Sequence, residues 1–359
     1  MAYQVINKHR LLAIGEKLCL SYRKGALYVH RQPEDKPEFL LKLPDFSFMG
    51  TLSLAERFFR LAPRCAVALE NGSFLISFHG GVYCVDPSLK KIRREHTYRE
   101  GMNHPLGFCK IQNISGFENS IAYGEYWGNL KNEEVAIYCR GAAGWEKACS
   151  FSPGQIKHIH GLFPDPYRQQ VLILTGDANL ESGIWSGKDQ FQLVRPLVYG
   201  DQQARACVLF PLPQGLLYAS DTPLEENFLF FAEEKEGAWK TEKIMPLPGP
   251  VIFGTKYELQ EGEAGFAFAT SVEPDPEIKG LGYFLSCRLA KGVKDRYSHV
   301  IGGNLEKGFH VLCSFRKDRL PMALFQFGNV LFPSGGLRGQ LFMCPQSLAK
   351  YNGKTLKWQ

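Results

Sequence analysis

The chain has 359 residues, of which 45% are hydrophobic, 13% aromatic and 22% charged, and its formal net charge is +6. This composition is ordinary for a folded globular protein and too rich in aromatic residues for a disordered one. Lys and Arg are scattered along the chain instead of forming an arm or a stripe, which argues against nucleic acid as a partner.

The N-terminal segment and the cysteines indicate where the protein works. The first twenty or so residues carry charges every few positions and contain no unbroken apolar run, so we expect neither a secretory signal nor a membrane anchor. The 10 cysteines lack CxxC spacing and lie mostly in apolar runs such as GVYCVD (81–86). Isolated core thiols stay reduced in the cytoplasm, and we therefore expect a cytoplasmic protein.

Short strands separated by Gly, Pro, Asn and Asp turns follow one another along the chain. A hairpin pattern covers residues 17–43, and the only helical pattern covers 52–62. After these, strands that end in a polar or glycine-rich turn recur at steps of roughly fifty residues. They cover residues 72–81, 119–128, 169–178, 214–223, 264–273 and 328–336.

Each recurring strand has extended neighbours on both sides. The segments expected to precede them are 63–72, 105–113, 156–166, 204–213, 250–259 and 309–318. The apolar hairpins expected to follow are 82–92, 135–151, 182–194, 227–244, 283–299 and 340–358. Four antiparallel strands repeated seven times predict an all-β fold, a seven-bladed β-propeller of four-stranded blades. We expect one domain over residues 1–359, in which the last and first segments share a blade and so remove a free edge.

Three of the expected turns carry traces of a known motif. The turns CRGAAGWEK (139–147), SGKDQFQLV (186–194) and EKEGAWKTEK (234–243) resemble degenerate Asp-boxes, SxDxGxxW, of the sialidase-like (BNR repeat) β-propellers. Ser186 and Asp189 match one copy, and Gly144 and Trp145 match another. The resemblance implies structural turns between the third and fourth strands of blades. No arginine triad for a sialic-acid carboxylate is found, so sialidase activity is not expected.

The candidate site residues follow from the strand order. If the box-like turns lie on one face of a propeller, the ends of second strands and the starts of first strands surround the channel mouth on the other face, where ligands bind by default. The expected second-strand ends carry His79, Glu125, Tyr126, Asp177, Asp221, Thr222, Glu273 and Ser334. The expected first-strand starts carry Arg64, His104, His158, His160, Arg205 and His310.

The HxH pair is the sharpest of these signals. His158 and His160 are two residues apart on a strand and therefore point to the same side. They are candidates for substrate contact or acid/base chemistry, for packing between blades, or for a divalent metal site with His104 and His310 as further candidate ligands.

The carboxylates suggest carbohydrate chemistry. Glu125 and Asp177 hold matching positions in adjacent repeats, as an acid and a base of a glycoside hydrolase would, and the aromatic surroundings of Glu125 make it the acid candidate. Asp221 and Thr222 are expected to bind substrate, although Asp177 and Asp221 also suit simple bonding to their own turns.

The remaining candidates are substrate-binding residues. Tyr126 and Trp127 are expected to stack on a sugar ring or to pack between blades, and Tyr126 is also a candidate base of a lyase. Arg64 and Arg205 are expected to hold an anionic sugar, and His79 is expected to bind substrate.

Taken together, these residues predict a propeller that binds an oligo- or polysaccharide and acts on it as a glycoside hydrolase or polysaccharide lyase. The alternative is a non-catalytic scaffold that binds another protein through its rim. The chain has no P-loop, no GxGxxG that opens a helix, no GxSxG and no HExxH, which argues against nucleotide-dependent chemistry and classical serine hydrolysis.

Overall fold

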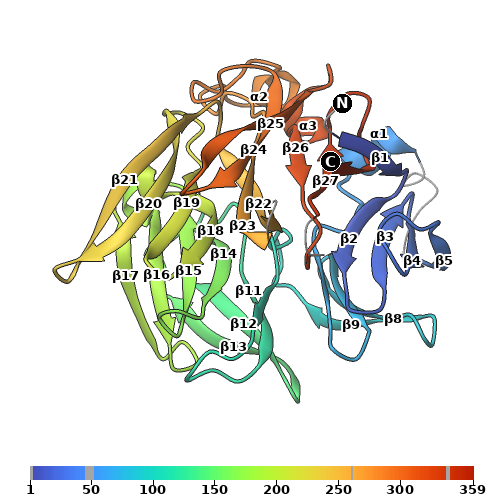
Figure 1. Ribbon diagram of the computed structural model, residues 1–359, viewed down its shortest axis with the longest axis horizontal. Coiled ribbons are helices and arrows are strands. Elements are labelled where there is room, and N and C mark those ends of the chain that lie inside the picture. The colour runs from blue at the N-terminus through green and yellow to red at the C-terminus, as the bar shows by residue number, and fades with distance from the viewer. Residues whose placement is uncertain (1–2, 45–51, 260–261, 337–339) are drawn as a thin grey trace. The chain divides into compact units, whose positions relative to one another are not determined.

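The computed structural model describes residues 3–44, 52–259, 262–336 and 340–359. The described residues form seven four-stranded antiparallel sheets (Figure 1). The predicted fold class, a seven-bladed β-propeller, is confirmed. The chain divides into two compact units, residues 1–94 with 248–359 and residues 95–247. None of the described helices combines the length and the apolar character that a membrane crossing requires.

The first unit contains four sheets in its two chain segments. The first sheet consists of β2 (Arg10–Ile14), β3 (Cys19–Arg23), β4 (Ala26–His30) and β5 (Glu38–Lys42). The second consists of β6 (Ala66–Ala68), β7 (Phe74–Phe78), β8 (Gly81–Asp86) and β9 (Lys91–Thr97), whose last residues belong to the second unit. The third consists of β22 (Val251–Glu258), β23 (Ala264–Thr270), β24 (Tyr297–Asn304) and β25 (Gly308–Arg316).

The fourth sheet of this unit joins the two ends of the chain. It has the order β1-β28-β27-β26, with β1 (Tyr3–Asn7), β26 (Asn329–Leu331), β27 (Phe342–Gln346) and β28 (Thr355–Trp358). Tyr3 pairs with Trp358, so the first strand of the chain completes the last sheet, as predicted. The backbone hydrogen bonds that β28 would otherwise leave open are thereby used.

Three short helices also belong to the first unit. They are α1 (Ser53–Phe58), α2 (Leu281–Leu285) and α3 (Met322–Phe325). The helix predicted within 52–62 is confirmed as α1. The strand predicted to begin at residue 283 is wrong, because residues 281–285 turn into α2 after Gly280 adopts a φ of 62°.

Two further strand assignments in this unit need correction. Residues 309–318 were expected to begin a new sheet, but they form the outer strand β25. Residues 328–336 were expected to be a second strand, but β26 is the first strand of its sheet. The reason is that β24 and β25 form a hairpin with the same apolar pattern as an inner pair, so the pattern alone does not number the strands.

The second unit, residues 95–247, contains three sheets built in chain order. The first consists of β10 (Cys109–Ile111), β11 (Ser120–Gly124), β12 (Val135–Gly141) and β13 (Gly144–Phe151). The second consists of β14 (His158–Asp165), β15 (Gln170–Gly176), β16 (Gly183–Lys188) and β17 (Leu193–Tyr199). The third consists of β18 (Ala206–Leu212), β19 (Gly215–Ser220), β20 (Asn227–Lys235) and β21 (Ala238–Leu247).

Two single-turn 3-10 helices complete this unit. They are η2 (Asn179–Glu181) and η3 (Gln202–Ala204). The three turns that resemble Asp-boxes lie between the third and fourth strands of its three sheets, at β12–β13, β16–β17 and β20–β21, where the resemblance implies them.

The core of the second unit lies between neighbouring sheets. Val171 and Ile173 of β15 join an apolar cluster with residues of β10 and β12, whereas Leu172 and Leu174 join a second cluster with residues of β18 to β20. Successive side chains of a strand point to opposite faces, so β15 is buried on both. This explains why residues 171–174 read as an unbroken apolar run and not as an alternating one. The same packing fixes the ends of β14, β15, β18 and β19, which carry the candidate site.

Candidate functional site

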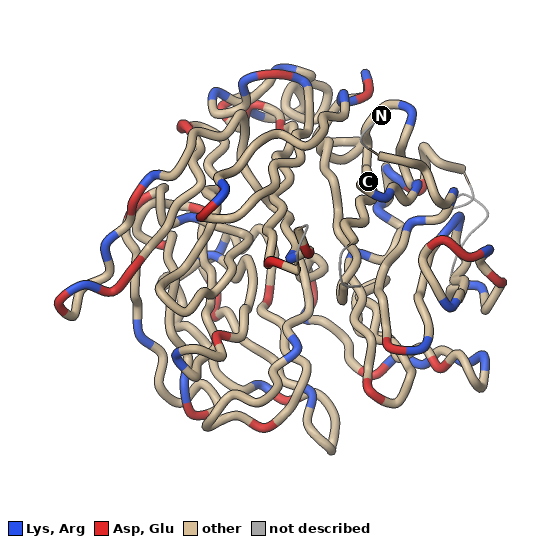
Figure 2. Tube along the Cα trace, viewed as in Figure 1, with Lys and Arg blue, Asp and Glu red and all other residues tan. Residues whose placement is uncertain are grey.

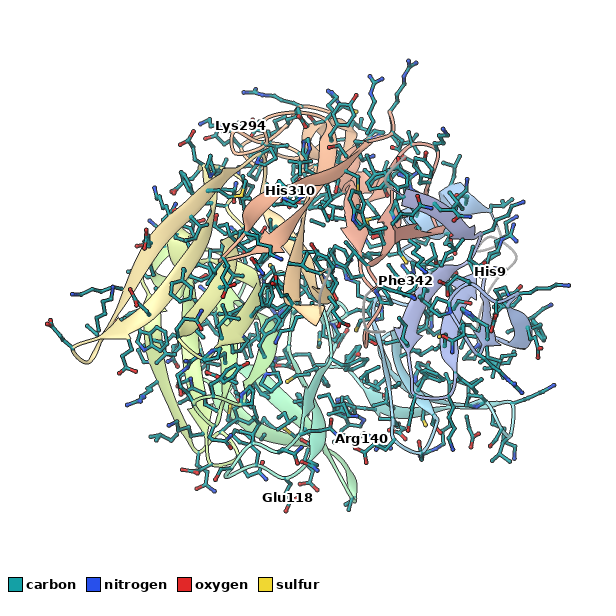
Figure 3. All side chains as sticks on the ribbon, in the orientation of Figure 1. His9, Glu118, Arg140, Lys294, His310 and Phe342 are labelled. Carbon is teal, nitrogen blue, oxygen red and sulfur yellow. The ribbon has the colours of Figure 1, made fainter. Side chains whose placement is uncertain are left out.

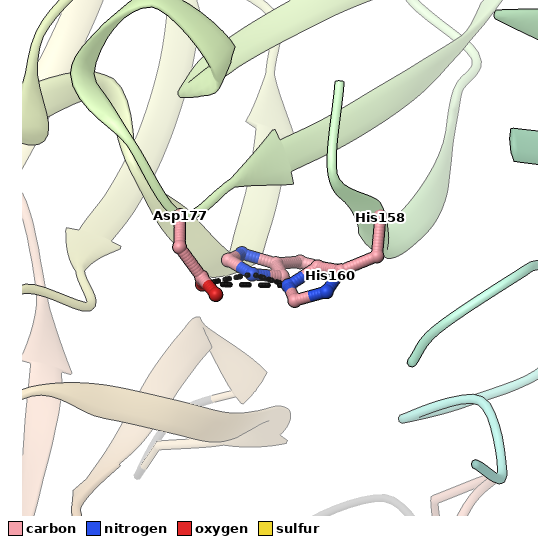
Figure 4. Close-up of side chains that lie close together, drawn as sticks. All are labelled: His158, His160 and Asp177. Carbon is pink, nitrogen blue, oxygen red and sulfur yellow. Dashed lines mark hydrogen bonds and ion pairs between the residues drawn. The ribbon is translucent and has the colours of Figure 1, made fainter. Parts of the chain in front are cut away.

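The candidate site lies within the second unit, at the starts of two first strands and the ends of two second strands. His158 and His160 begin β14, Asp177 follows β15, Arg205 precedes β18 and Asp221 follows β19. The structure thus brings five of the predicted site residues into one cluster, and Figure 4 shows its centre.

A β-bulge positions the second histidine. The register between β14 and β15 shifts between Ile159 and Gly161, so His160 is the extra residue on its strand. The next sheet has the same irregularity between Ala206 and Val208, with Cys207 as the extra residue. A bulge re-aims the side chain it carries. His160 and Cys207 therefore both point into the same polar cluster from adjacent first strands.

The two imidazoles face each other through the same kind of nitrogen. His158 Nε2 lies 2.9 Å from His160 Nε2. The Nδ1 atom of His158 lies 2.7 Å from the Trp127 carbonyl oxygen, and that of His160 lies 2.9 Å from the Ala206 carbonyl oxygen. A carbonyl oxygen only accepts, so each Nδ1 must donate a proton. When both rings are neutral, each Nε2 then presents a lone pair to the other.

Two nitrogen lone pairs at this distance repel each other unless a proton or a metal cation lies between them. Burial lowers the pKa of His158, which favours its neutral form. One proton shared by the two nitrogens, or one metal cation bound to both, removes this repulsion. Histidine that binds a metal characteristically donates its other ring N–H to a carbonyl or a carboxylate, as both of these rings do.

Asp177 completes the triad. Its Oδ1 atom lies 3.4 Å from His158 Nε2 and 3.5 Å from His160 Nε2, close enough for the three side chains to bind one metal ion. Ligands about 2.1 Å from a metal lie ~3.0 Å apart at right angles and ~3.4 Å apart at tetrahedral angles. The three observed separations therefore span the range that a single ion requires.

The glycine before Asp177 allows this approach. A Cβ atom on Gly176 would lie 2.5 Å from Cε1 of His160, nearer than the ring could tolerate. Glycine is therefore required in the TGD segment for a spatial reason that the sequence does not reveal.

Two cations neutralise Asp177. Arg205 Nη2 lies 3.0 Å from Asp177 Oδ1, and Lys157 Nζ lies 3.5 Å from Asp177 Oδ2. Burial raises the pKa of the Asp177 carboxyl, but the two histidines and the Arg205 charge outweigh it and hold the pKa well below its usual range. Asp177 is therefore ionised at neutral pH, and its side chain retains 32% exposure.

Cys207 and Asp221 lie on the other side of Arg205. The Cys207 thiol donates to Asp221 Oδ2 over 3.2 Å, and Arg205 Nη2 lies 3.5 Å from the same oxygen. His160, Cys207 and Asp221 also have the spacing of metal ligands. However, burial and the Asp221 charge raise the pKa of Cys207 well above its usual value, so the thiol keeps its proton. A metal ion binds the thiolate form of cysteine, so Cys207 would first have to lose its proton. The triad of His158, His160 and Asp177 needs no such step and is therefore the more favourable metal site.

Aromatic residues line the histidine side of the cluster. The Tyr126 ring centroid lies 4.5 Å from that of His158 and 6.2 Å from that of His160. Trp127 contributes its backbone carbonyl to His158, while its buried ring packs under the guanidinium of Arg99 at 4.7 Å. Tyr126 is thus the aromatic side chain that borders the imidazoles, and Trp127 supports them from behind.

The Glu125 side chain lies in a closed environment, although its backbone carbonyl accepts the N–H of Ile159, the residue between the two histidines. Its residue is 2% exposed, and its Oε2 atom accepts the Ala136 N–H at 2.8 Å and lies 3.4 Å from Arg99 Nη1. Burial raises the pKa of Glu125, although the Ala136 and Arg99 contacts oppose this. Thr222 is likewise enclosed, because its N–H and hydroxyl both donate to Asn227.

The other predicted site residues lie elsewhere. His104 is half-buried beside Tyr98. In the first unit, Arg64 lies over the Phe253 ring, and His79 is exposed in a turn with a φ of 42°. The expectation that His310 starts a first strand is wrong, because it is exposed on the outer strand β25 (Figure 3). Among the described residues, neither His104 nor His310 belongs to a group with metal-ligand spacing.

Sequence reasoning missed two contributors to the cluster and one residue that binds Glu125. Cys207 reads as a core thiol, and only its bulge turns it toward Asp221. Lys157 directly precedes the HxH pair and was overlooked because isolated lysines are usually solvated. Arg99 follows β9 and binds Glu125, Glu133 and the Glu134 carbonyl, which no local pattern indicates.

Comparisons with known proteins support the fold and no more. No protein-family model matches the sequence, and no relative is found among curated proteins. A chain of the mitotic checkpoint complex is similar with a TM-score of 0.53 at 9% identity, over 98% of this chain and 89% of that one. A prolyl endopeptidase is similar with a TM-score of 0.52 at 9% identity, over 95% of this chain and 47% of that one. This chain thus spans about half the endopeptidase, and what it shares with both proteins is the β-propeller fold.

Proposed function

We propose that this protein is a metal-dependent enzyme of the polysaccharide lyase type, which binds a divalent cation through His158, His160 and Asp177 and acts on an acidic carbohydrate. The observation that carries the proposal is the contact between the two imidazole Nε2 atoms. In both rings Nδ1 donates its proton to a backbone carbonyl oxygen. The Nε2 lone pairs of both rings are therefore free to bind a cation, and the Asp177 carboxylate lies close to both nitrogens.

The charge of the cluster supports an anionic substrate. Asp177 and Asp221 are balanced by Lys157 and Arg205, so the four side chains together are neutral. A bound divalent cation would make the cluster net positive. A uronate carboxylate is the sugar group that such a site attracts, and Arg205 adds its positive charge to that attraction.

The surroundings favour elimination over hydrolysis. Hydrolysis of a glycosidic bond needs an acid that reaches the bond, whereas Glu125 is enclosed by Ala136 and Arg99. Elimination needs a base next to a carboxylate whose charge is neutralised. Tyr126 borders His158 and is the candidate base, while its ring offers a face for a sugar.

Metal analysis tests the centre directly. Protein purified without chelator should contain close to one divalent metal ion per chain, and His158→Ala and His160→Ala should each lose it. His299→Ala is the matched control, because His299 also pairs with an aspartate, Asp295, but belongs to no group with metal-ligand spacing among the described residues. Metal-free protein, or equal metal in all four proteins, would overturn the proposal.

Product analysis tests the chemistry. Incubation with oligouronates should produce an unsaturated uronate, which is detected by its ultraviolet absorbance. Chelator should abolish the absorbance and added metal should restore it. Release of a saturated sugar instead would show hydrolysis and would contradict the proposed elimination.

An exposed apolar surface favours a second candidate function, the binding of a protein partner. Helix α3 contacts both α1 and α2 in the first unit. Leu281 is 76% exposed on α2, where Phe284 and Leu285 are also exposed. Leu54 and Phe58 are exposed on α1. Apolar patches of this kind often mark interaction sites. A partner that co-purifies in stoichiometric amount with the parent protein, and not with a Leu281→Glu/Leu285→Glu variant, would support this function.

A further inference from the structure

A second polar site lies within the first unit, where a cavity of about 240 Å³ opens beside α1 and β3. Figure 2 marks the many Lys and Arg positions of this unit. Six basic residues line the cavity: Lys8, Arg10, Arg23, Lys24, Arg57 and Lys354. Glu56 is its only acidic lining residue among those described. The sequence does not show this gathering, because Arg10 and Lys354 lie at opposite ends of the chain.

Arg10 forms the buried wall of the cavity. The residue is 6% exposed, its Nη2 donates to the Pro63 carbonyl, and its guanidinium lies 5.6 Å from the Tyr22 ring centroid. Its Nε atom has no hydrogen-bond partner. Burial lowers the pKa of Arg10, which reflects the cost of removing the charge from water. Neither contact supplies a full negative charge to offset it.

The nearby acids are already engaged. The Tyr22 hydroxyl donates to Glu56, and burial raises the pKa of that carboxyl. Asp318 pairs with Arg57 Nη1 at 2.7 Å, on the side where Arg57 also donates to the Phe325 carbonyl. Lys8, Arg23 and Lys24 are exposed at the cavity. The lining therefore keeps a large excess of positive charge.

A second unpartnered atom belongs to another lining residue of the cavity. Gln326 lines the cavity with a φ of 71°, and its buried Oε1 position lacks a hydrogen-bond partner. Buried polar groups are normally paired, and an exception calls for a missing partner. The Arg10 Nε–H is a donor and suits a phosphate oxygen, whereas Gln326 Oε1 is an acceptor and suits a hydroxyl donor of the same ligand.

We propose that this cavity binds a small phosphorylated ligand, a phosphate monoester or diphosphate, whose charge is neutralised by Arg10 and the surrounding lysines. Arginine and lysine are the usual phosphate binders, and a phosphate carries up to two charges and three strong acceptors. A single carboxylate would leave most of the excess positive charge uncompensated. The cavity is smaller than the usual drug-sized pocket of roughly 300 to 1,000 Å³, which fits a compact anion.

This site and the metal centre share no residue, so each can be tested without the other. Isothermal titration calorimetry with chelator-treated full-length protein should show one-site binding of pyrophosphate and of glycerol 3-phosphate. Binding should weaken as salt is added, because exposed charges are screened. No detectable binding of either probe at millimolar concentration would overturn the inference.

Charge-reversal variants locate the binding. Arg10→Met should abolish binding, but it alters the core and can impair folding. Lys8→Glu/Lys24→Glu changes only exposed residues of the cavity and should weaken binding on the order of tenfold or more per charge. Lys17→Glu/Lys36→Glu is the matched control, because both residues are exposed and neither lines the cavity. Equal loss in both double variants would mean a general charge effect and would overturn the site.

Two further arms fix the ligand and the place. His158→Ala should bind pyrophosphate as the parent does, and loss of binding would place the anion at the metal centre instead. Tighter binding of citrate than of pyrophosphate would overturn the assignment to phosphate. Vesicles of phosphatidylcholine with phosphatidic acid distinguish a lipid source, and binding to these alone, without any soluble phosphate, would contradict a small soluble ligand.

Discussion

Arg205 lies 3.0 Å from Asp177, although one precedes β18 and the other follows β15 of the neighbouring sheet. Arg205 also lies 3.5 Å from Asp221, so one guanidinium holds two carboxylates of adjacent sheets. This arrangement fixes Asp177 toward the two histidines. The Arg205–Asp177 pair is therefore expected to contribute both to the stability of the second unit and to the proposed metal centre.

Substitution of Arg205 should separate these two roles. Arg205→Lys keeps the charge but loses the planar fork, so we expect KM for an oligouronate to rise about tenfold with a small change in kcat. Arg205→Met leaves two carboxylates without their shared cation and should destabilise the fold by roughly 3 kcal/mol. Steady-state kinetics and urea unfolding measure the two effects. An unchanged KM in the lysine variant would remove Arg205 from substrate binding.

The Cys207 thiol should be unreactive and should not be needed for turnover. Its raised pKa and its hydrogen bond to Asp221 keep the thiol protonated. We expect Cys207→Ser to retain full turnover and metal, because a hydroxyl also donates to Asp221. Cys207 should also resist iodoacetamide in the folded protein, as seen by peptide mass mapping. A large loss of turnover in Cys207→Ser would instead identify the sulfur as a ligand or nucleophile.

Substitution of Glu125 tests whether this residue is the general acid predicted from the sequence or only a buried partner of Ala136 and Arg99. Glu125→Gln keeps an oxygen to accept the Ala136 N–H but loses the charge beside Arg99. We expect turnover within about threefold of the parent, whereas loss of a general acid costs at least about a hundredfold. The melting temperature should fall by several degrees. A hundredfold loss of turnover at an unchanged melting temperature would restore Glu125 as the acid.

His9 should make stability depend on pH. Burial, assisted by the positive charge of Arg23 and by the neighbouring His30, lowers the pKa of His9 from 6.5 to about 4. Between these values the unfolded chain binds a proton that the folded chain does not, so this contribution to stability is present above pH 6.5 and is lost as the pH falls toward 4. Urea unfolding across this range should show a smaller decline for His9→Gln than for the parent. Lys8→Gln serves as the control, and identical slopes for the His9 variant and the parent would contradict the prediction.

Much of the fold could be predicted because it depends on local patterns. A strand buried on both faces, such as β15, is an apolar run between two turns, and seven such units predict seven sheets. The strand numbering failed near β25, because a hairpin at the edge of a sheet has the same local pattern as one in its middle. Residues 281–285 failed for a related reason, since a short apolar run suits a strand or a helix equally and tertiary contacts decide between them.

The candidate site was determined by the sequence only in part. The two-residue spacing of His158 and His160 and the position of Asp177 after an apolar strand are local facts, and they were enough to predict that these side chains gather. The sequence could not show that Gly176 makes room for His160, that a bulge turns Cys207 toward Asp221, or that Arg10 meets Lys354 around one cavity. Those contacts depend on the register between strands and on packing between residues far apart in the chain, which no local periodicity specifies and only the folded structure decides.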